Sequence, residues 1–300
     1  MSLSRLHGID PGRVGVFAGP LSGQPAAIQR EFAREMERLG YGTIWYGESL
    51  GREAFAQGAI YLAATERLVV ASGIANFWAR DAAAMANGGR TLAEAWPGRF
   101  ILGVGVSHAP LVEMRGHDYE RPYTAMTEYL DAMDAAPWRG PEVALPPVVL
   151  AALGPKMVGL ADERTAGAYP YFTTANHVRE VRRILGPEPF LAADLPVVLA
   201  GDLASARTIG DRHLGFYLGS ANYRNNLLRI GWSEADLEKP GSDALFEAIV
   251  AWGDVGRIAD RMHERFKAGA DQVVLNLVAA DPSAPPLAEL RLFAPLTQGT

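Results

Sequence analysis

Short apolar runs alternate with amphipathic segments along almost the whole chain. Each run is bounded by glycine, proline or polar residues, a pattern typical of strands buried on both faces of a parallel sheet. We therefore predict eight strands, at residues 14–17, 43–47, 68–74, 100–106, 148–152, 167–174, 196–200 and 272–278.

The segments between these runs predict helices. In residues 26–39 the apolar side chains Ile28, Phe32 and Met36 recur at helical spacing, and Gly40 follows as a stop. Other helix starts are indicated by a capping aspartate or an early proline, at Asp81, Pro122, Pro155 and Asp254. Strands that alternate with helices favour a (β/α)8 TIM barrel. We find no internal repeat and no domain boundary, so we expect one domain over residues 1–300, with the barrel at about 14–280.

Composition limits the functional classes. The 300 residues are 49% hydrophobic, which is enough for one large core. A net charge of −6 argues against a nucleic-acid-binding protein. The absence of cysteine excludes disulfides, thiolate catalysis and cysteine-bound metals. The first residues lack the apolar core of a signal peptide, and no run of about 18 apolar residues occurs. We expect a cytoplasmic protein that does not bind membranes.

The run at residues 100–106 carries two glycines, Gly103 and Gly105, and is followed at once by Ser107 and His108. Residues two apart on a strand point to the same side, so the glycines leave space for something flat to lie against the backbone. The alternative is that they only relieve crowding inside a barrel. Barrel enzymes keep their chemistry at the carboxyl ends of the strands. Because its ordinary pKa is near 6.5, His108 is our candidate proton donor at that end.

Several other sites are not indicated. The glycines of residues 103–105 do not form a dinucleotide-binding fingerprint, because His108 takes the place of the third glycine and Pro110 follows. The six histidines lack metal-ligand spacing, so no metal site is expected. A nucleophile elbow of the G-x-S-x-G type is also missing.

Polar and small residues end several predicted strands. Gly154 and Pro155 open a helix after the fifth strand, and Thr173 and Thr174 end the sixth. Free helix N–H groups and two hydroxyls suit a phosphate, with Lys156 adding charge nearby. Three aromatic residues can line the flat space over the third and fourth strands, namely Trp45, Phe77 and Trp78. We expect them to contact a substrate as well. A phosphate anchor beside a flat slot suggests a flavin-like cofactor, and the alternative is that small residues simply fill a barrel.

Two motifs make a family resemblance specific. The segments ASGIANFWARD at residues 71–81 and PGRFILGVG at residues 97–105 resemble the bacterial luciferase-like monooxygenase superfamily. Within it, the chain is similar to the coenzyme F420-dependent oxidoreductases over about residues 14–278, and residues 221–227 and 254–278 resemble one subgroup. The resemblance implies a TIM barrel that binds its cofactor at the carboxyl ends of the strands.

The resemblance also implies roles for particular residues. A bulge that backs the cofactor ring in the family, often with a non-prolyl cis peptide, maps to Ser72, Gly73 and Ile74. An acidic residue that ends the second strand maps to Glu48, to which we assign a catalytic role. The family more often has histidine after this residue, where this chain has Ser49, so that role is not transferred.

Other cofactor contacts follow from the same resemblance. The phosphate contacts map to Leu153, Gly154, Thr173 and Thr174. The polar residue after the fourth strand maps to Ser107 or His108, and Asn76 completes the predicted cofactor group.

These observations predict an F420-dependent oxidoreductase that transfers a hydride between C5 of the deazaflavin and a small organic substrate. An FMN-dependent monooxygenase on the same fold is one alternative. A barrel that binds cofactor without turnover is another. We expect a homo-oligomer, in the form of a dimer, and no partner other than the small-molecule substrate.

Overall fold

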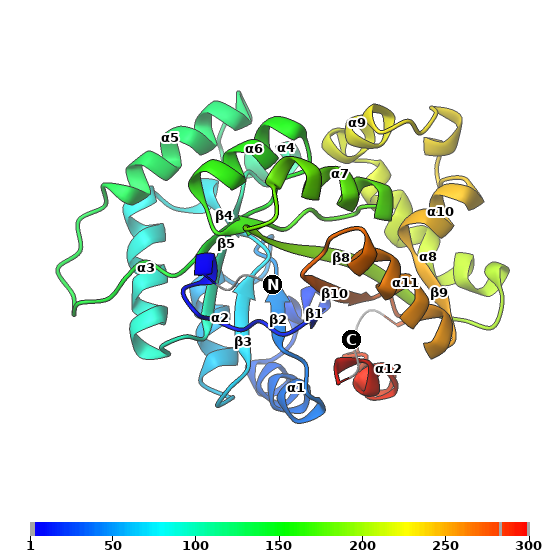
Figure 1. Cartoon of the computed structure of the whole chain (residues 1–300), viewed down its shortest axis with the longest axis horizontal. Helices are drawn as coiled ribbons and strands as arrows, with labels where there is room; N and C mark the ends of the chain where they lie inside the picture. Colours follow the sequence, from blue (N-terminus) through cyan, green and yellow to red (C-terminus); the bar gives the residue numbers. More distant parts are fainter. Residues whose placement is uncertain (1–3, 282–283, 299–300) are drawn as a thin grey trace.

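The computed structural model describes residues 4–281 and 284–298. Within these residues the strands form one parallel sheet in the order β10-β1-β2-β3-β5-β6-β7-β8, and β8 pairs with β10 to close it (Figure 1). The eight barrel strands are β1 Val14–Phe17, β2 Thr43–Tyr46, β3 Val69–Ser72, β5 Phe100–Gly105, β6 Val148–Leu150, β7 Gly167–Ala168, β8 Phe190–Leu199 and β10 Gln272–Leu277. Two short strands are added, β4 Ala75–Asn76 beside β5 and β9 Ala251–Gly253 beside β8. The predicted TIM barrel is confirmed.

Helices surround the barrel (Figure 1). They are α1 Ala26–Leu39, α2 Ala54–Leu62, α3 Ala82–Ala95, α4 Ala109–Met114, α5 Pro122–Asp134, α6 Pro155–Arg164, α7 Ala175–Leu185, α8 Leu203–Leu218, α9 Ala221–Arg229, α10 Asp243–Ile249, α11 Val255–Lys267 and α12 Leu287–Phe293. The carboxylates of Asp81 and Asp254 cap α3 and α11 as predicted. In the part of the chain that the structure describes, no helix is both long and apolar enough to span a bilayer.

Side-chain alternation along the strands makes two apolar layers. Val14 and Val16 of β1 belong to the large cluster that joins the barrel to its helices. The barrel interior is filled by a second cluster that includes Trp45, Ile101 and Val274. Trp45 is 0% exposed and its indole nitrogen donates to Gln272 Oε1 at 2.7 Å. Because successive strand residues face opposite sides, strands such as β2, β5 and β10 contribute to both layers.

Three predicted elements differ from the structure. The sixth predicted strand, 167–174, is reduced to β7, and residues 169–174 lead away from the sheet to α7. The seventh begins at Phe190, six residues before the predicted start at Pro196. Residues 108–121, a polar segment for which no helix was predicted, contain α4. Each difference lies where a polar residue or a proline interrupts the apolar pattern.

Candidate active site

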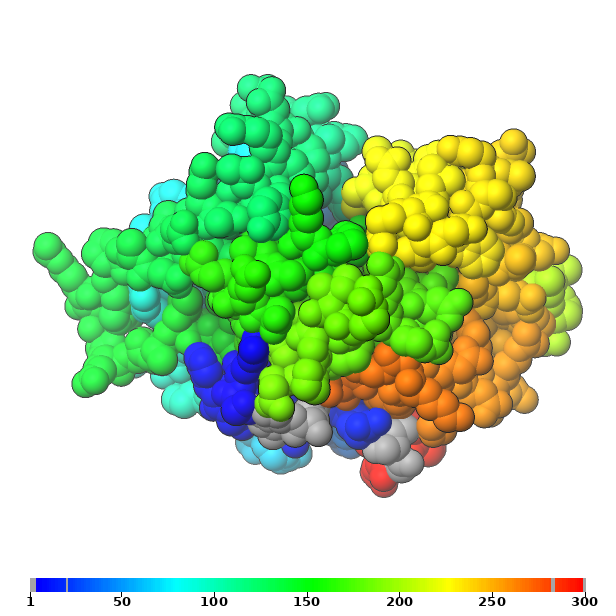
Figure 2. Space-filling model, turned by 45° about the horizontal axis from the view of Figure 1, so that its top comes forward, coloured from blue at the N-terminus to red at the C-terminus, as the bar shows by residue number. Residues whose placement is uncertain are grey.

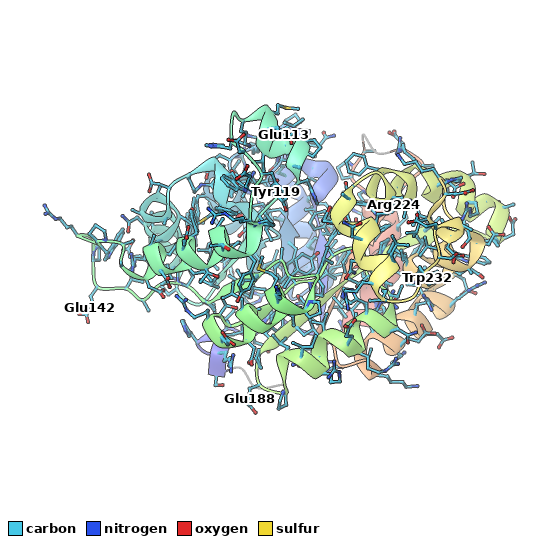
Figure 3. All side chains as sticks on the ribbon, turned by 90° about the horizontal axis from the view of Figure 1, so that it is seen from above. Glu113, Tyr119, Glu142, Glu188, Arg224 and Trp232 are labelled. Atoms are coloured by element: carbon cyan, nitrogen blue, oxygen red, sulfur yellow. The ribbon has the colours of Figure 1, made fainter. Side chains whose placement is uncertain are left out.

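A cavity of about 570 Å³ lies at the carboxyl ends of the barrel strands. Its walls come from the segments that follow β2, β3, β5, β6 and β7 and from α8 and α9. In Figure 2 the green segments that include α4 to α6 and the yellow segment that includes α9 stand on either side of the upper surface. Seen from above, Tyr119, which lines the cavity, lies near the middle of the molecule, and Arg224 of α9 lies to its right (Figure 3). The predicted site residues that line this cavity are Glu48, Gly73, Ile74, Ser107, His108, Leu153 and Gly154.

A bulge separates β3 from β4, and the peptide bond between Gly73 and Ile74 within it is cis, as the resemblance implied. The two glycines of β5 make room for this bulge. A Cβ atom at Gly103 would overlap the carbonyl oxygen of Ser72, and one at Gly105 would lie 2.7 Å from Ile74 Cγ1. The space predicted to lie open beside Gly103 and Gly105 is therefore filled by the neighbouring strand, and the cavity lies beyond it.

Replacing Gly103 with alanine should displace the bulge and destabilise the fold by about 3 kcal/mol or more, because the added methyl group meets backbone atoms. Urea unfolding would measure the loss of free energy. Gly159→Ala is the matched control: no atom lies within 4 Å of an added Cβ there, and alanine in a helix gains up to about 1 kcal/mol. Equal stability of the two variants would contradict this assignment.

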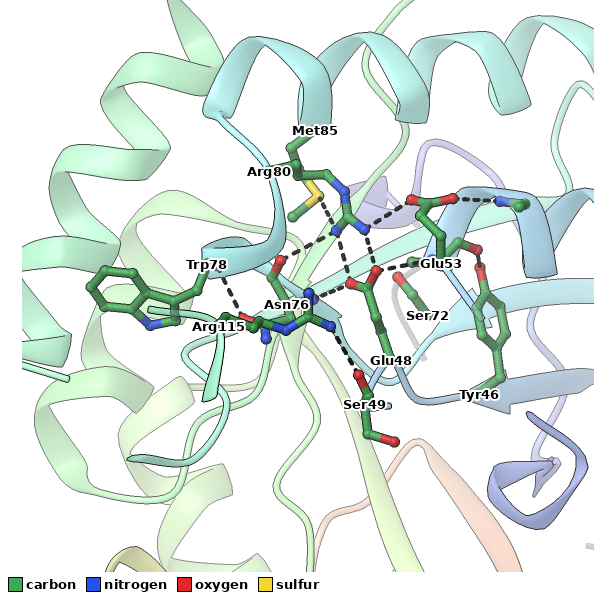
Figure 4. A network of polar contacts seen from close by, with 12 residues as sticks. Tyr46, Glu48, Ser49, Glu53, Ser72, Asn76, Trp78, Arg80, Met85 and Arg115 are labelled. Atoms are coloured by element: carbon green, nitrogen blue, oxygen red, sulfur yellow. Dashed lines mark hydrogen bonds and ion pairs between the residues drawn. The ribbon is translucent and has the colours of Figure 1, made fainter. Parts of the chain in front are cut away.

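Glu48 is held by several hydrogen bonds and an ion pair (Figure 4). Both of its carboxylate oxygens accept hydrogen bonds from Arg80, with Nη1 of Arg80 2.9 Å from Oε2. Oε2 also accepts from the Asn76 amide at 2.8 Å, and Oε1 accepts from the Ala54 amide at 3.2 Å. The backbone amide of Glu48 donates to the Ile74 carbonyl oxygen at 3.1 Å. The geometry therefore makes Glu48 the residue that ties the bulge to Arg80, and its catalytic role stays a prediction.

Glu48→Gln separates the two roles. The substitution keeps the side chain's size but leaves buried Arg80 with Glu53, 2.8 Å away, as its remaining ion-pair partner. Breaking a buried ion pair typically costs about 3–5 kcal/mol, so we expect a loss near 3 kcal/mol in urea unfolding. A variant with wild-type stability and a large loss of turnover would favour the catalytic role instead.

His108 lines the cavity and packs against the ring of Tyr223, with the ring centroids 5.4 Å apart. Burial lowers the pKa of His108 below its ordinary 6.5, and a side-chain hydrogen bond with Asn222 opposes this shift. Its buried Nδ1 atom has no hydrogen-bond partner among the described residues. His108 is therefore mainly neutral at pH 7 and keeps one ring nitrogen free for a ligand.

The start of α6 has the features of an anion site. Gly154 is its N-cap and no side chain caps the helix, so backbone N–H groups stay available. A Cβ atom at Gly154 would meet no atom within 4 Å, which leaves room for a ligand against the backbone. Asn225, Asn226 and Arg229 of α9 line the same cavity. Helix N–H groups beside a guanidinium suit a phosphate, so these residues fit the implied cofactor. Lys156, by contrast, is exposed and is not part of the lining.

The two threonines of the predicted phosphate site lie elsewhere. Thr173 and Thr174 are buried and neither lines the cavity. The hydroxyl of Thr174 instead caps α7 by accepting from the His177 amide at 3.2 Å. His177 in turn contacts the Leu153 carbonyl oxygen through Nε2 at 2.9 Å. Thr174 is thus linked to the Leu153 loop through His177, and Thr173 has no such link among the described residues.

The three aromatic residues predicted to wall the site do not line the cavity either. Trp45 is enclosed in the barrel interior and stacks on Tyr169, with ring centroids 4.4 Å apart. Phe77 and Trp78 pack on each other behind the bulge, with centroids 4.6 Å apart.

Two predicted cofactor contacts, Ser72 and Asn76, make hydrogen bonds within the protein and do not line the cavity. Ser72 donates its hydroxyl to the Gly103 carbonyl at 2.8 Å, and the Asn76 side chain accepts from the Trp78 amide at 3.0 Å.

The aromatic wall of the cavity was not predicted. It consists of Tyr169, Tyr171, Phe216, Tyr217 and Tyr223. The two tyrosines after β7 follow a strand of only two residues, and the other three residues lie on α8 and α9, outside the strand ends that guided the prediction. The polar face of α9 was detectable, because Asn222, Asn225, Asn226 and Arg229 repeat at intervals of three and four residues.

The sequence profile described as luciferase-like monooxygenase matches residues 10–272. The chain belongs to this family. It is an oxidoreductase of the luciferase-like family, whose members use flavin or deazaflavin cofactors. A Mycobacterium tuberculosis protein named "Putative coenzyme F420-dependent oxidoreductase" is 24% identical, and the alignment covers 90% of this chain and 96% of that protein.

Solved structures of the luciferase-like family show the same fold. An F420-dependent secondary alcohol dehydrogenase, in complex with an F420-acetone adduct, aligns with a TM-score of 0.73 at 16% identity and covers 95% of this chain and 97% of that one. The oxygenating constituent of 3,6-diketocamphane monooxygenase from Pseudomonas putida, in complex with FMN, aligns with a TM-score of 0.70 at 13% identity over 96% of this chain and 97% of that one. Both cofactors therefore occur on this fold.

Proposed function

We propose that the protein is an F420-dependent oxidoreductase that acts on a small organic substrate. The observation that carries the choice of F420 is the M. tuberculosis relative, because it aligns over 90% of this chain and is named for that coenzyme. The bulge at Gly73 and Ile74 and the open start of α6 support a ring-and-phosphate cofactor of either kind.

F420, when bound, supplies or accepts a hydride at C5 of its deazaflavin ring. The bulge at Gly73–Ile74 would support the ring and leave the rest of the cavity to the substrate. Backbone N–H groups at Gly154 and the guanidinium of Arg229 would hold the phosphate. We assign to His108 the transfer of the proton that accompanies the hydride, because its buried Nδ1 has no hydrogen-bond partner among the described residues.

Side-by-side titrations with F420 and FMN test the proposal. We expect F420 to bind at least tenfold more tightly than FMN. Quenching of cofactor fluorescence would report the binding of each. Reduced F420 in the complex should consume little oxygen, because the deazaflavin has carbon where flavin has N5. Tighter binding of FMN together with oxygen-coupled turnover would establish the monooxygenase alternative instead. Binding of either cofactor without turnover on any substrate would favour the non-catalytic alternative.

A further inference from the structure

A chain of hydrogen bonds connects a fully buried carboxyl group with the cavity wall. Asp194 of β8 is 0% exposed, and the side chain of Asn276 on β10 hydrogen-bonds to it. Nδ2 of Asn276 donates to the hydroxyl oxygen of Tyr171 at 2.7 Å. The hydroxyl of Tyr217 donates to the same oxygen at 2.9 Å. Two neighbours held by packing therefore fix the position of the Tyr171 hydroxyl.

The hydrogen of the Tyr171 hydroxyl is available to a ligand. A phenol oxygen has two acceptor positions and one rotatable hydrogen. Asn276 donates to one acceptor position, and in the orientation in which the Tyr217 hydroxyl donates to the other, the hydrogen of Tyr171 is left for a ligand. No acceptor is assigned to this hydrogen among residues 4–281 and 284–298, and Tyr171 lines the cavity. Burial raises the pKa of Tyr171 well above its ordinary range and that of Tyr217 to about 12, so both stay protonated at neutral pH. Tyr171 is thus a fixed, neutral hydrogen-bond donor.

The charges around the cavity indicate a neutral ligand beside Tyr171. Glu48 is paired with Arg80. Arg229, which is paired with Glu180 at 2.6 Å, is the cation that we assign to the cofactor phosphate and not to the substrate. The wall next to Tyr171 is aromatic and consists of Tyr169, Tyr217 and Tyr223. A charged group at this wall would lose its hydration without gaining a counterion, which is costly in an aromatic environment. A neutral molecule with one acceptor atom fits better.

We propose that the substrate is a neutral carbonyl compound or the corresponding alcohol, and that Tyr171 donates a hydrogen bond to its oxygen during hydride transfer. This inference rests on the proposed function. In the reducing direction the carbonyl carbon gains the hydride, the π electron pair moves onto the oxygen, and the oxygen then takes a proton from His108. The reductant is reduced F420, which gives up the hydride and one proton and becomes F420. The Tyr171 hydroxyl stabilises the negative charge that develops on the substrate oxygen.

The test uses the full chain loaded with reduced F420 and a panel of probes. The neutral probes are cyclohexanone, cyclohex-2-enone and acetophenone, and 4-acetylbenzoate is the charged counterpart. We expect reduction of at least one neutral probe and a rate at least tenfold lower for the charged one. Tyr171→Phe should lower kcat by about 10²–10³-fold, as removal of an oxyanion donor typically does, with F420 affinity unchanged. Tyr217→Phe removes one of the two donors to Tyr171 and should have a smaller effect. Tyr123→Phe, an exposed tyrosine outside the lining, should have none.

Each outcome decides the inference. If F420 does not bind to the wild-type protein, the proposed function fails and the inference fails with it. If F420 binds but no neutral probe is reduced, the substrate class is wrong while the cofactor assignment stands. If a probe is reduced and Tyr171→Phe changes kcat less than threefold, or weakens F420 binding as far as it lowers kcat, Tyr171 is a wall residue and not the donor.

Discussion

Gly154→Glu should weaken F420 binding by about 100-fold while the protein stays folded. The new carboxylate would lie at the N-cap of α6, close to the site we assign to the cofactor phosphate. Two like charges about 6 Å apart at an effective dielectric constant of about 20 repel by roughly 3 kcal/mol, which corresponds to about a 100-fold change in affinity. Fluorescence titration with F420 measures the effect directly.

Two further variants at position 154 separate charge from size. Gly154→Gln carries a side chain of the same size without the charge, so it should weaken binding much less than Gly154→Glu. Gly154→Ala should change affinity less than threefold, because a Cβ atom there meets nothing within 4 Å. If Gly154→Glu binds F420 as tightly as the wild type, the phosphate is not held at the start of α6.

His108→Asn should lower turnover by about 10²–10⁴-fold and leave F420 affinity almost unchanged, because it removes a proton-transfer group and keeps a polar side chain. The pH dependence follows from the lowered pKa of His108. As pH falls from 7, more imidazolium forms, so substrate reduction should become faster in the wild type and substrate oxidation slower. The variant should lose this dependence.

The measurement is steady-state kinetics of wild type and His108→Asn between about pH 5.5 and 7.5, one unit on either side of the ordinary pKa of histidine. A loss of turnover below tenfold would show that His108 only forms part of the wall. An equal loss of cofactor affinity and turnover would lead to the same conclusion.

The fold was largely predictable because parallel strands buried on both faces leave an apolar run in the sequence. The runs that became β1, β2, β5 and β10 were predicted within one residue of their observed ends. The first half of β8 was missed, since Asp194 and Pro196 interrupt its apolar pattern. The three residues of β9 are too few to show a pattern of their own.

The cavity was predictable in part. Gly73, Ile74, His108 and Gly154 lie at strand ends, where the barrel fold itself places functional groups. Thr173 could not be judged from sequence, because its burial depends on how residues 169–174 leave the barrel. The tyrosine wall depends on the packing of α8 and α9 over the barrel. That packing is set by long-range contacts, which local spacing does not record.

Transfer of deuterium from reduced F420 labelled at C5 tests the central claim most directly. The protein would be mixed with labelled cofactor and each neutral carbonyl probe without oxygen, and the product would be examined by mass spectrometry. We predict one deuterium on the former carbonyl carbon, with one equivalent of F420 formed for each product molecule. A product without deuterium, or product formation only when FMN and oxygen are supplied, would contradict direct hydride transfer from F420.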